Sequence, residues 1–169
     1  PFLDGNGRLG RLLITLMLCE AGALREPILY LSLYFKARRA DYYRLLQEVR
    51  ENGAWEAWME YFLTGVRDTA AQAVDTAREI MALFDEDAGT IQTLGRSAAS
   101  ALRVHDFMQR RPLVTIQAAS KELKLSLPTV GKSLEHLVDL GIVREVTGKQ
   151  RRRVFAYRKY LDVLDRGIE

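Results

Sequence analysis

The stretch LVDLGIVREVTGKQRRRVFAY, residues 137–157, decides the fold of the second half of the chain. It begins with the end of an apolar helical face that closes at Gly141. Beyond that glycine, apolar and polar residues alternate on either side of Thr147-Gly148-Lys149-Gln150. A period of two around a glycine-containing turn is typical of a two-stranded hairpin. The sequence therefore predicts a helix that ends at Gly141 and is followed by a β-hairpin.

Three helices are predicted ahead of this hairpin. The first covers 91–110 and ends before a proline. Thr115 can cap a short second helix over 116–126, and Pro128 suits the first turn of the third. The residues expected to face inward are Ile116, Ala119 and Leu123 in the second helix and Val130, Leu134, Leu137 and Leu140 in the third. The order is therefore helix, helix–turn–helix, hairpin.

That order and the quoted stretch resemble the winged helix-turn-helix class of bacterial regulators. The resemblance implies binding of double-stranded DNA, with the third helix at a groove and the hairpin wing straddling phosphates. The residues expected to meet DNA are Ser126, Thr129, Lys132, Ser133, Lys149, Arg151, Arg152 and Arg153. Winged helices also act as dimerisation or domain-packing units, so this second reading stays open.

Charge is distributed unevenly along the chain. Residues 1–100 hold 11 Lys+Arg and 14 Asp+Glu, a net charge of −3. Residues 101–169 hold 14 Lys+Arg and 8 Asp+Glu, a net charge of +6. The asymmetry indicates two functional halves, the second of which favours polyanions.

The first residues, PFLDGNGRLGR over 1–11, carry the clearest chemical signal of the first half. Asp4 to Arg8 is predicted to be a loop, and a helix is predicted from Leu9 to about Gly22. Free backbone N–H groups at a helix N-terminus attract anions, and Asp4 beside them suits Mg²⁺ shared with a polyphosphate. Arg8 and Arg11 are three residues apart, so both guanidinium groups can grip phosphate oxygens.

This motif resembles the signature of the Fic family, His-x-Phe-x-Asp/Glu-Gly-Asn-Gly-Arg-x-x-Arg, from its second position onward. Residues 27–66 are also similar to bacterial Fic proteins that carry a C-terminal extension. The resemblance implies a transferase that moves AMP from ATP to a Ser, Thr or Tyr hydroxyl of a protein, with Mg²⁺ and ATP as required partners. It also implies a role for several positions of this chain.

In the family, Asp4 would hold the Mg²⁺, and Gly5, Asn6 and Gly7 would form the anion nest around the phosphates. Arg8 would bind near the β-phosphate, and Arg11 would contact the terminal phosphate. Tyr43 would line the adenine pocket. Phe2 would anchor the loop in the core.

The catalytic histidine of the signature would immediately precede Pro1. The chain is therefore expected to be the C-terminal part of a longer protein and, by itself, not to catalyse the transfer. His105 and His136 lie far downstream, and each is expected to be an ordinary surface or helix-packing residue. An alternative is a DNA-binding regulator or dimerisation module with a degenerate nucleotide site.

The rest of the first half is expected to be helical, over 28–38, 41–51 and from Trp55 to about Phe84. The last of these helices carries an aromatic and apolar stripe that is typical of a core or a helix–helix contact. Apolar surface left uncovered there would be hidden by domain packing or in a homodimer. The acidic stretch 85–90 is predicted to be a loop.

The expected fold class is mainly α: an all-helical Fic core over 1–88 with a long helical extension, then a winged helix-turn-helix over 89–169. Cys19 is the single cysteine, so no disulfide forms within the chain, and a cytoplasmic location is expected by default. No run of about 18 uncharged apolar residues occurs, so no membrane partner is expected.

Overall fold

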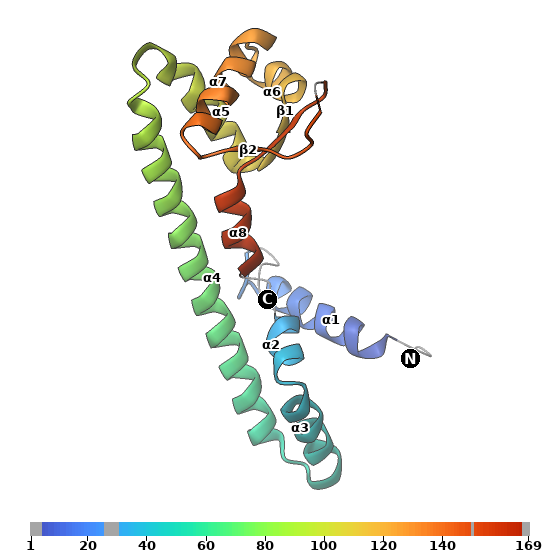
Figure 1. The fold of residues 1–169 in the computed structure, drawn as a ribbon. Helices are drawn as coiled ribbons and strands as arrows, with labels where there is room; N and C mark the ends of the chain where they lie inside the picture. Colours follow the sequence, from blue (N-terminus) through green and yellow to red (C-terminus); the bar gives the residue numbers. More distant parts are fainter. Residues whose placement is uncertain (1–4, 26–30, 150, 167–169) are drawn as a thin grey trace. The chain divides into compact units, whose positions relative to one another are not determined.

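The computed structural model describes residues 5–25, 31–149 and 151–166. The protein is mainly helical and carries a small three-stranded antiparallel sheet, which confirms the predicted fold class (Figure 1). Its contacts divide the chain into two compact units, with the division between Asp75 and Thr76. None of the helices in the described ranges is long and apolar enough to cross a membrane.

The first helix, α1 (Asn6–Glu20), begins earlier than predicted. Gly5 takes the left-handed conformation, with φ 82°, and turns the chain directly into the helix. Asn6, Gly7 and Arg8 therefore form its first turn instead of a loop, which corrects the predicted extent of the loop. Because the first N–H groups of a helix have no intrahelical partner, this turn still presents backbone donors.

The other helices of the first unit are α2 (Leu31–Ala37), α3 (Arg39–Asn52) and the start of α4 (Trp55–Gln92). Their core is aromatic: Phe35 is buried, and its ring lies 6.4 Å from those of Trp58 and Phe62. The stripe on α4 is therefore partly core, as predicted. Trp55, by contrast, is 61% exposed.

Helix α4 continues through Asp85–Thr90, where a loop was predicted. The cause is Asp87, which is buried and hydrogen-bonded inside the second unit, so the acidic stretch is not a solvated turn. Helix α4 ends instead at Gln92. Gly95 then has φ 60° and begins a short 3-10 helix, η1 (Gly95–Ser97). The helix predicted over 91–110 is thus shorter, as α5 (Ala98–Arg110).

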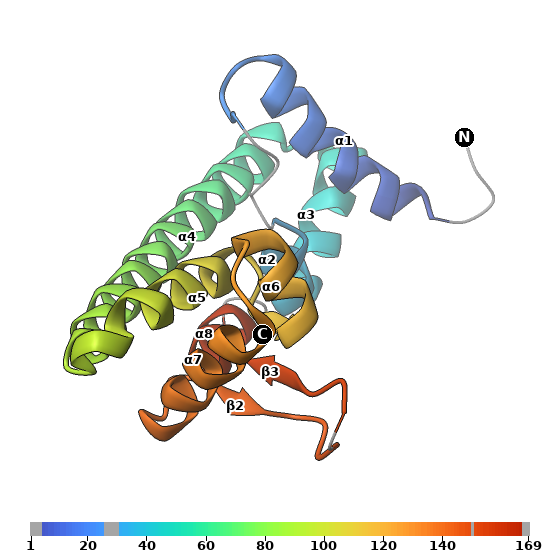
Figure 2. The same ribbon diagram turned by 90° about the horizontal axis from the view of Figure 1, so that it is seen from above.

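The second unit has the predicted order of helices and hairpin (Figure 2). Its elements after α5 are β1 (Leu113–Thr115), α6 (Ile116–Leu123), α7 (Leu127–Asp139), β2 (Arg144–Glu145), β3 (Val154–Ala156) and α8 (Arg158–Arg166). Strand β3 lies between β1 and β2 and is antiparallel to both. The hairpin and the Thr115 cap were predicted, whereas the Ser126 cap, β1 and α8 were not.

The core of the second unit gathers around α5 and α7. Val104, Met108, Val130, Leu134 and Leu137 are completely buried. The inner faces predicted for α6 and α7 therefore point into this core, with Ala119 buried and Ile116 and Leu123 packed at its edge. This packing fixes which side chains of α7 remain available on the surface.

Candidate functional sites

An open cavity of about 280 Å³ in the first unit is lined by α1, α2 and α3. It brings together Arg11 and Tyr43, two residues that the sequence assigned separately to a phosphate and to an adenine ring. The side chains that line it are Arg11, Ser32, Phe35, Lys36, Arg39, Tyr42 and Tyr43. Arg8 is not among its described lining residues.

The lining of this cavity combines positive charge with aromatic rings. Arg11, Lys36 and Arg39 supply three cations, and no carboxylate is among the lining residues that the structure describes. The Arg39 guanidinium carbon lies 5.5 Å from the centre of the Tyr43 ring, at cation–π distance. Cations beside flat rings suit a ligand that joins an anion to a planar group.

Two glycines lie at the N-terminal end of α1, before Arg11. A side chain at Gly7 would place its Cβ 3.4 Å from a terminal nitrogen of Arg11, which is close packing. At Gly5 the positive φ disfavours any other residue. The guanidinium groups of Arg8 and Arg11 thus lie close to the first turn, where the N–H groups and the helix dipole also favour anions.

The metal ligand expected from the sequence, Asp4, lies outside the described residues. Among residues 5–25, 31–149 and 151–166, no group of three or more His, Cys, Asp or Glu is arranged to hold a metal ion. The Mg²⁺ expectation therefore stays a prediction tied to Asp4.

The tip of the hairpin wing in the second unit is held by Glu145. Its carboxylate accepts hydrogen bonds from the backbone N–H groups of Thr147 (2.8 Å) and Gly148 (2.9 Å) and from the Thr147 hydroxyl. These bonds, first of all that from the Thr147 side chain, lower the pKa of Glu145. The wing is thus a built turn that presents Lys149 to solvent.

A second cavity, of about 450 Å³, is lined by three arginines of the wing and by the starts of two helices. Arg151, Arg152 and Arg153 contribute the charge. Ile116 and Gln117 open α6, and Leu127 opens α7. Helix N-termini carry partial positive charge, so both helices add to the field of the arginines. The cavity is strongly suited to an anion.

Two residues predicted to contact DNA at the start of α7 also form hydrogen bonds within the protein. The Ser126 hydroxyl oxygen accepts a hydrogen bond from the Thr129 backbone N–H at 3.2 Å and lies 2.8 Å from the Thr129 hydroxyl. The Ser126 side chain therefore caps the helix. Ser126 is nonetheless exposed, and so is Lys132, six residues further along the chain.

Two of the predicted contacts are placed differently from expectation. Ser133 is only 1% exposed and donates to the Ser100 hydroxyl at 3.1 Å, because it shares the inward face of α7 with Val130 and Leu137. It cannot reach a DNA groove, which corrects that prediction. Arg153 forms an ion pair with Glu135 of α7 at 3.4 Å, so it also ties the wing to that helix.

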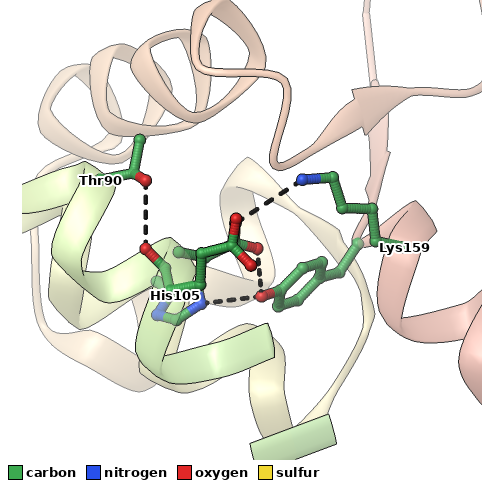
Figure 3. Close-up of polar contacts among 6 residues, drawn as sticks. Thr90, His105 and Lys159 are labelled. Atoms are coloured by element: carbon green, nitrogen blue, oxygen red, sulfur yellow. Dashed lines mark hydrogen bonds and ion pairs between the residues drawn. The ribbon is translucent and has the colours of Figure 1, made fainter. Parts of the chain in front are cut away.

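The sequence did not reveal a buried polar network that joins α4, α5 and the residue after β3 (Figure 3). The Tyr157 hydroxyl lies 2.6 Å from an Asp87 carboxylate oxygen and 3.1 Å from Nε2 of His105. Lys159 approaches the same carboxylate at 3.9 Å. His105 is fully buried, as expected for a packing histidine, and this burial lowers its pKa.

No protein-family model matches the chain.

Proposed function

We propose that the first unit binds a nucleoside triphosphate, as the C-terminal part of a Fic-type AMP transferase. The observation that carries the proposal is the shared cavity of Arg11 and Tyr43, which come from different helices and were assigned to the two ends of one nucleotide. Lys36 and Arg39 add positive charge to the same cavity. A triphosphate joined to a flat base matches this combination.

In this proposal the nucleotide phosphates bind to the first turn of α1 and to the arginines of that helix. Gly5, Asn6 and Gly7 provide backbone N–H groups, and Arg8 and Arg11 provide charge-assisted hydrogen bonds. Tyr43 covers the base. Asp4 would hold a Mg²⁺ ion, which would supply positive charge for the nucleotide phosphates.

The full reaction is proposed for a longer chain that includes the histidine of the Fic signature. A protein hydroxyl oxygen attacks the α-phosphorus of ATP and gives up its proton to that histidine. The bond between the α-phosphorus and the pyrophosphate oxygen breaks, which leaves AMP on the protein. The residues of the present chain would hold the nucleotide in line for this attack.

Titration calorimetry of the chain with ATP and Mg²⁺ tests the binding step. Arg11→Ala and Tyr43→Ala should each weaken ATP binding by roughly tenfold or more, because each removes one of the two contacts. Arg50→Ala removes an exposed arginine of α3 outside the cavity and should leave the affinity unchanged. Equal affinities in all four proteins would overturn the proposal.

A second candidate function is binding of double-stranded DNA by the second unit. It is favoured by the cavity in which three wing arginines meet the N-termini of α6 and α7, and by the net charge of +6 over 101–169. Phosphates are the ligands that such a surface recognises without regard to sequence. Lys149 and Lys132 would extend the contact along the duplex.

The salt dependence of duplex retention separates DNA binding from domain packing. The double variant Arg151→Ala/Arg152→Ala should bind more weakly and reduce the slope of log affinity against log salt by roughly two. The variant Arg96→Ala/Arg110→Ala removes the same charge from exposed positions outside the cavity and serves as the control. Equal losses in both would show a general charge effect, and no loss in either would favour packing.

A further inference from the structure

The ring of Tyr43, which the proposed function assigns to the nucleotide base, lies at the surface of the first unit. Tyr43 is 56% exposed. Exposed side chains change rotamer within nanoseconds unless a neighbour holds them. A ring that is held in place before the ligand arrives binds a base at a lower cost in entropy than a ring that rotates freely. The contacts of this ring therefore bear on how well the cavity recognises a base.

Two neighbouring side chains contact the Tyr43 ring. Arg39 lies four residues earlier on α3, so the two residues are on the same face of the helix. Its guanidinium carbon is 5.5 Å from the centre of the ring. The Tyr42 ring meets the Tyr43 ring nearly at right angles, with the centres 5.3 Å apart, and its own centre is 5.1 Å from that of the buried Phe35 ring. Tyr43 is thus linked through Tyr42 to the aromatic core of the first unit.

The guanidinium group of Arg39 has no carboxylate partner among the residues that the structure describes. Arg44, on the same helix, forms an ion pair with Asp41 at 3.3 Å. Arg38 stacks on a different ring, because its guanidinium carbon lies 4.1 Å from the centre of Tyr34, and it is not among the described residues that line the cavity. The contact that the structure gives Arg39 is therefore with the ring that lines the cavity.

We propose, on the premise that the cavity binds a nucleotide as proposed, that Arg39 holds the Tyr43 ring for stacking and makes the cavity prefer a nucleoside triphosphate to a polyphosphate without a base. The cation is attracted to the negative face of the ring, and this attraction restricts the rotation of the side chain. More than half of Tyr43 is exposed, and that surface is available to a base. Arg39 is thus a positioning residue, which acts through Tyr43.

Direct binding of the phosphates is the other role that the charge of Arg39 allows, and the two roles have different effects on two ligands. Inorganic triphosphate has a phosphate chain of the same length as ATP but no base. A residue that binds the phosphates contributes to the affinity of both ligands. A residue that holds the stacking ring contributes to the affinity of ATP alone. The ratio of the two affinities therefore distinguishes the roles.

Titration calorimetry with ATP and with inorganic triphosphate, each with Mg²⁺ at physiological ionic strength, measures this ratio. Arg39→Gln should weaken ATP binding by roughly two- to fivefold, the range of a cation–π contact at an exposed position, and should leave the affinity for inorganic triphosphate unchanged. Arg39 is exposed and glutamine is a good helix former, so the variant should fold. In a Tyr43→Ala background the same substitution should have no further effect, because the ring is gone.

Arg38→Gln is the matched control, because it removes an equal charge and a cation–π contact one residue away, outside the described lining of the cavity. It should change neither affinity. Equal losses for both ligands in Arg39→Gln would place Arg39 at the phosphates and overturn the positioning role, as would an unchanged affinity for ATP. If Tyr43→Ala bound ATP as tightly as the parent protein, the proposed base contact itself would be wrong, and the role of Arg39 with it.

Discussion

The hydroxyl of Tyr157 donates a 2.6 Å hydrogen bond to the carboxylate of Asp87, seventy residues earlier in the chain. Both side chains are almost fully buried. The bond joins the last turns of α4 to the end of β3, so it ties the long helix to the winged part of the second unit. Desolvation, followed by the neighbouring carboxylate, strongly raises the pKa of Tyr157, which keeps the hydroxyl protonated as a donor.

Tyr157→Phe should lower the free energy of unfolding by about 2 kcal/mol, because a buried charged acceptor loses its donor. Urea denaturation followed by circular dichroism measures the change. Tyr160→Phe is the matched control, since Tyr160 packs at the edge of the same core and is more exposed. The network would have no stabilising role if the two variants unfolded at the same urea concentration.

The free energy of unfolding should also decrease as the pH is lowered, because of His105. Tyr157 donates to Asp87, so Nε2 of His105 donates to Tyr157 and its Nδ1 is left to accept from Gln109. This arrangement requires a neutral ring, and burial lowers the pKa of His105 below its ordinary value of 6.5. A lowered pKa means that stability is complete above pH 6.5 and is lost as the pH falls through the folded-state pKa.

Urea midpoints measured from pH 7.5 down to pH 5 check this dependence. His105→Gln should lose less stability between pH 7.5 and pH 5 than the parent protein, because it has no imidazole to protonate. The variant will nevertheless be less stable than the parent at pH 7.5. Ser100→Ala, a polar position of α5 without a titratable group, should keep the pH dependence of the parent protein. If the urea midpoint of His105→Gln decreased with falling pH as steeply as that of the parent protein, the acid sensitivity would be due to carboxylates instead.

The sequence predicted those elements of the second unit whose signals are local. Thr115 is a cap residue whose hydrogen-bond partner lies three positions away, and Gly141 ends its helix with φ 71°. Strand β1 was missed because three residues are too few to show a period of two. It exists because β3 pairs with it from some forty residues away, a partner that no local pattern reveals.

The candidate sites were predictable to a similar degree. The basic residues of the wing and those of the α1 motif are each contiguous in the sequence, so the gathering of positive charge at both places could be predicted. The inward orientation of Ser133 depends on α7 packing against Ser100 of α5, and the Asp87–Tyr157–His105 network depends on three distant elements. Acidic residues beside a glycine usually indicate a loop, but the burial of Asp87 overrides that pattern here.

Ser126 is expected to stabilise α7 through its cap. Ser126→Ala should cost about 1 kcal/mol of unfolding free energy, because the Thr129 N–H loses its acceptor. Ser126→Asp restores an acceptor and should recover most of that loss in the same urea experiment. If aspartate were no better than alanine, the hydroxyl pair with Thr129, and not the cap, would be the important contact.

Two glycines of α4 should respond in opposite directions to the same substitution. A Cβ at Gly65 would lie 2.8 Å from ring carbons of Tyr34, whose ring is also held by Arg38 at 4.1 Å and by Tyr61. Gly65→Ala should therefore lower the unfolding free energy by about 1–3 kcal/mol through overpacking. A Cβ at Gly89 would meet nothing within 4 Å.

Gly89→Ala should instead raise the unfolding free energy by up to about 1 kcal/mol, because alanine favours the helix and glycine does not. Thermal or urea unfolding of the two single variants gives the comparison directly. Tyr34→Ala in the Gly65→Ala background should recover part of the loss that is due to the clash, measured against Tyr34→Ala alone. A stabilising Gly65→Ala would mean that α2 and α4 do not pack as closely as the Tyr34 ring requires.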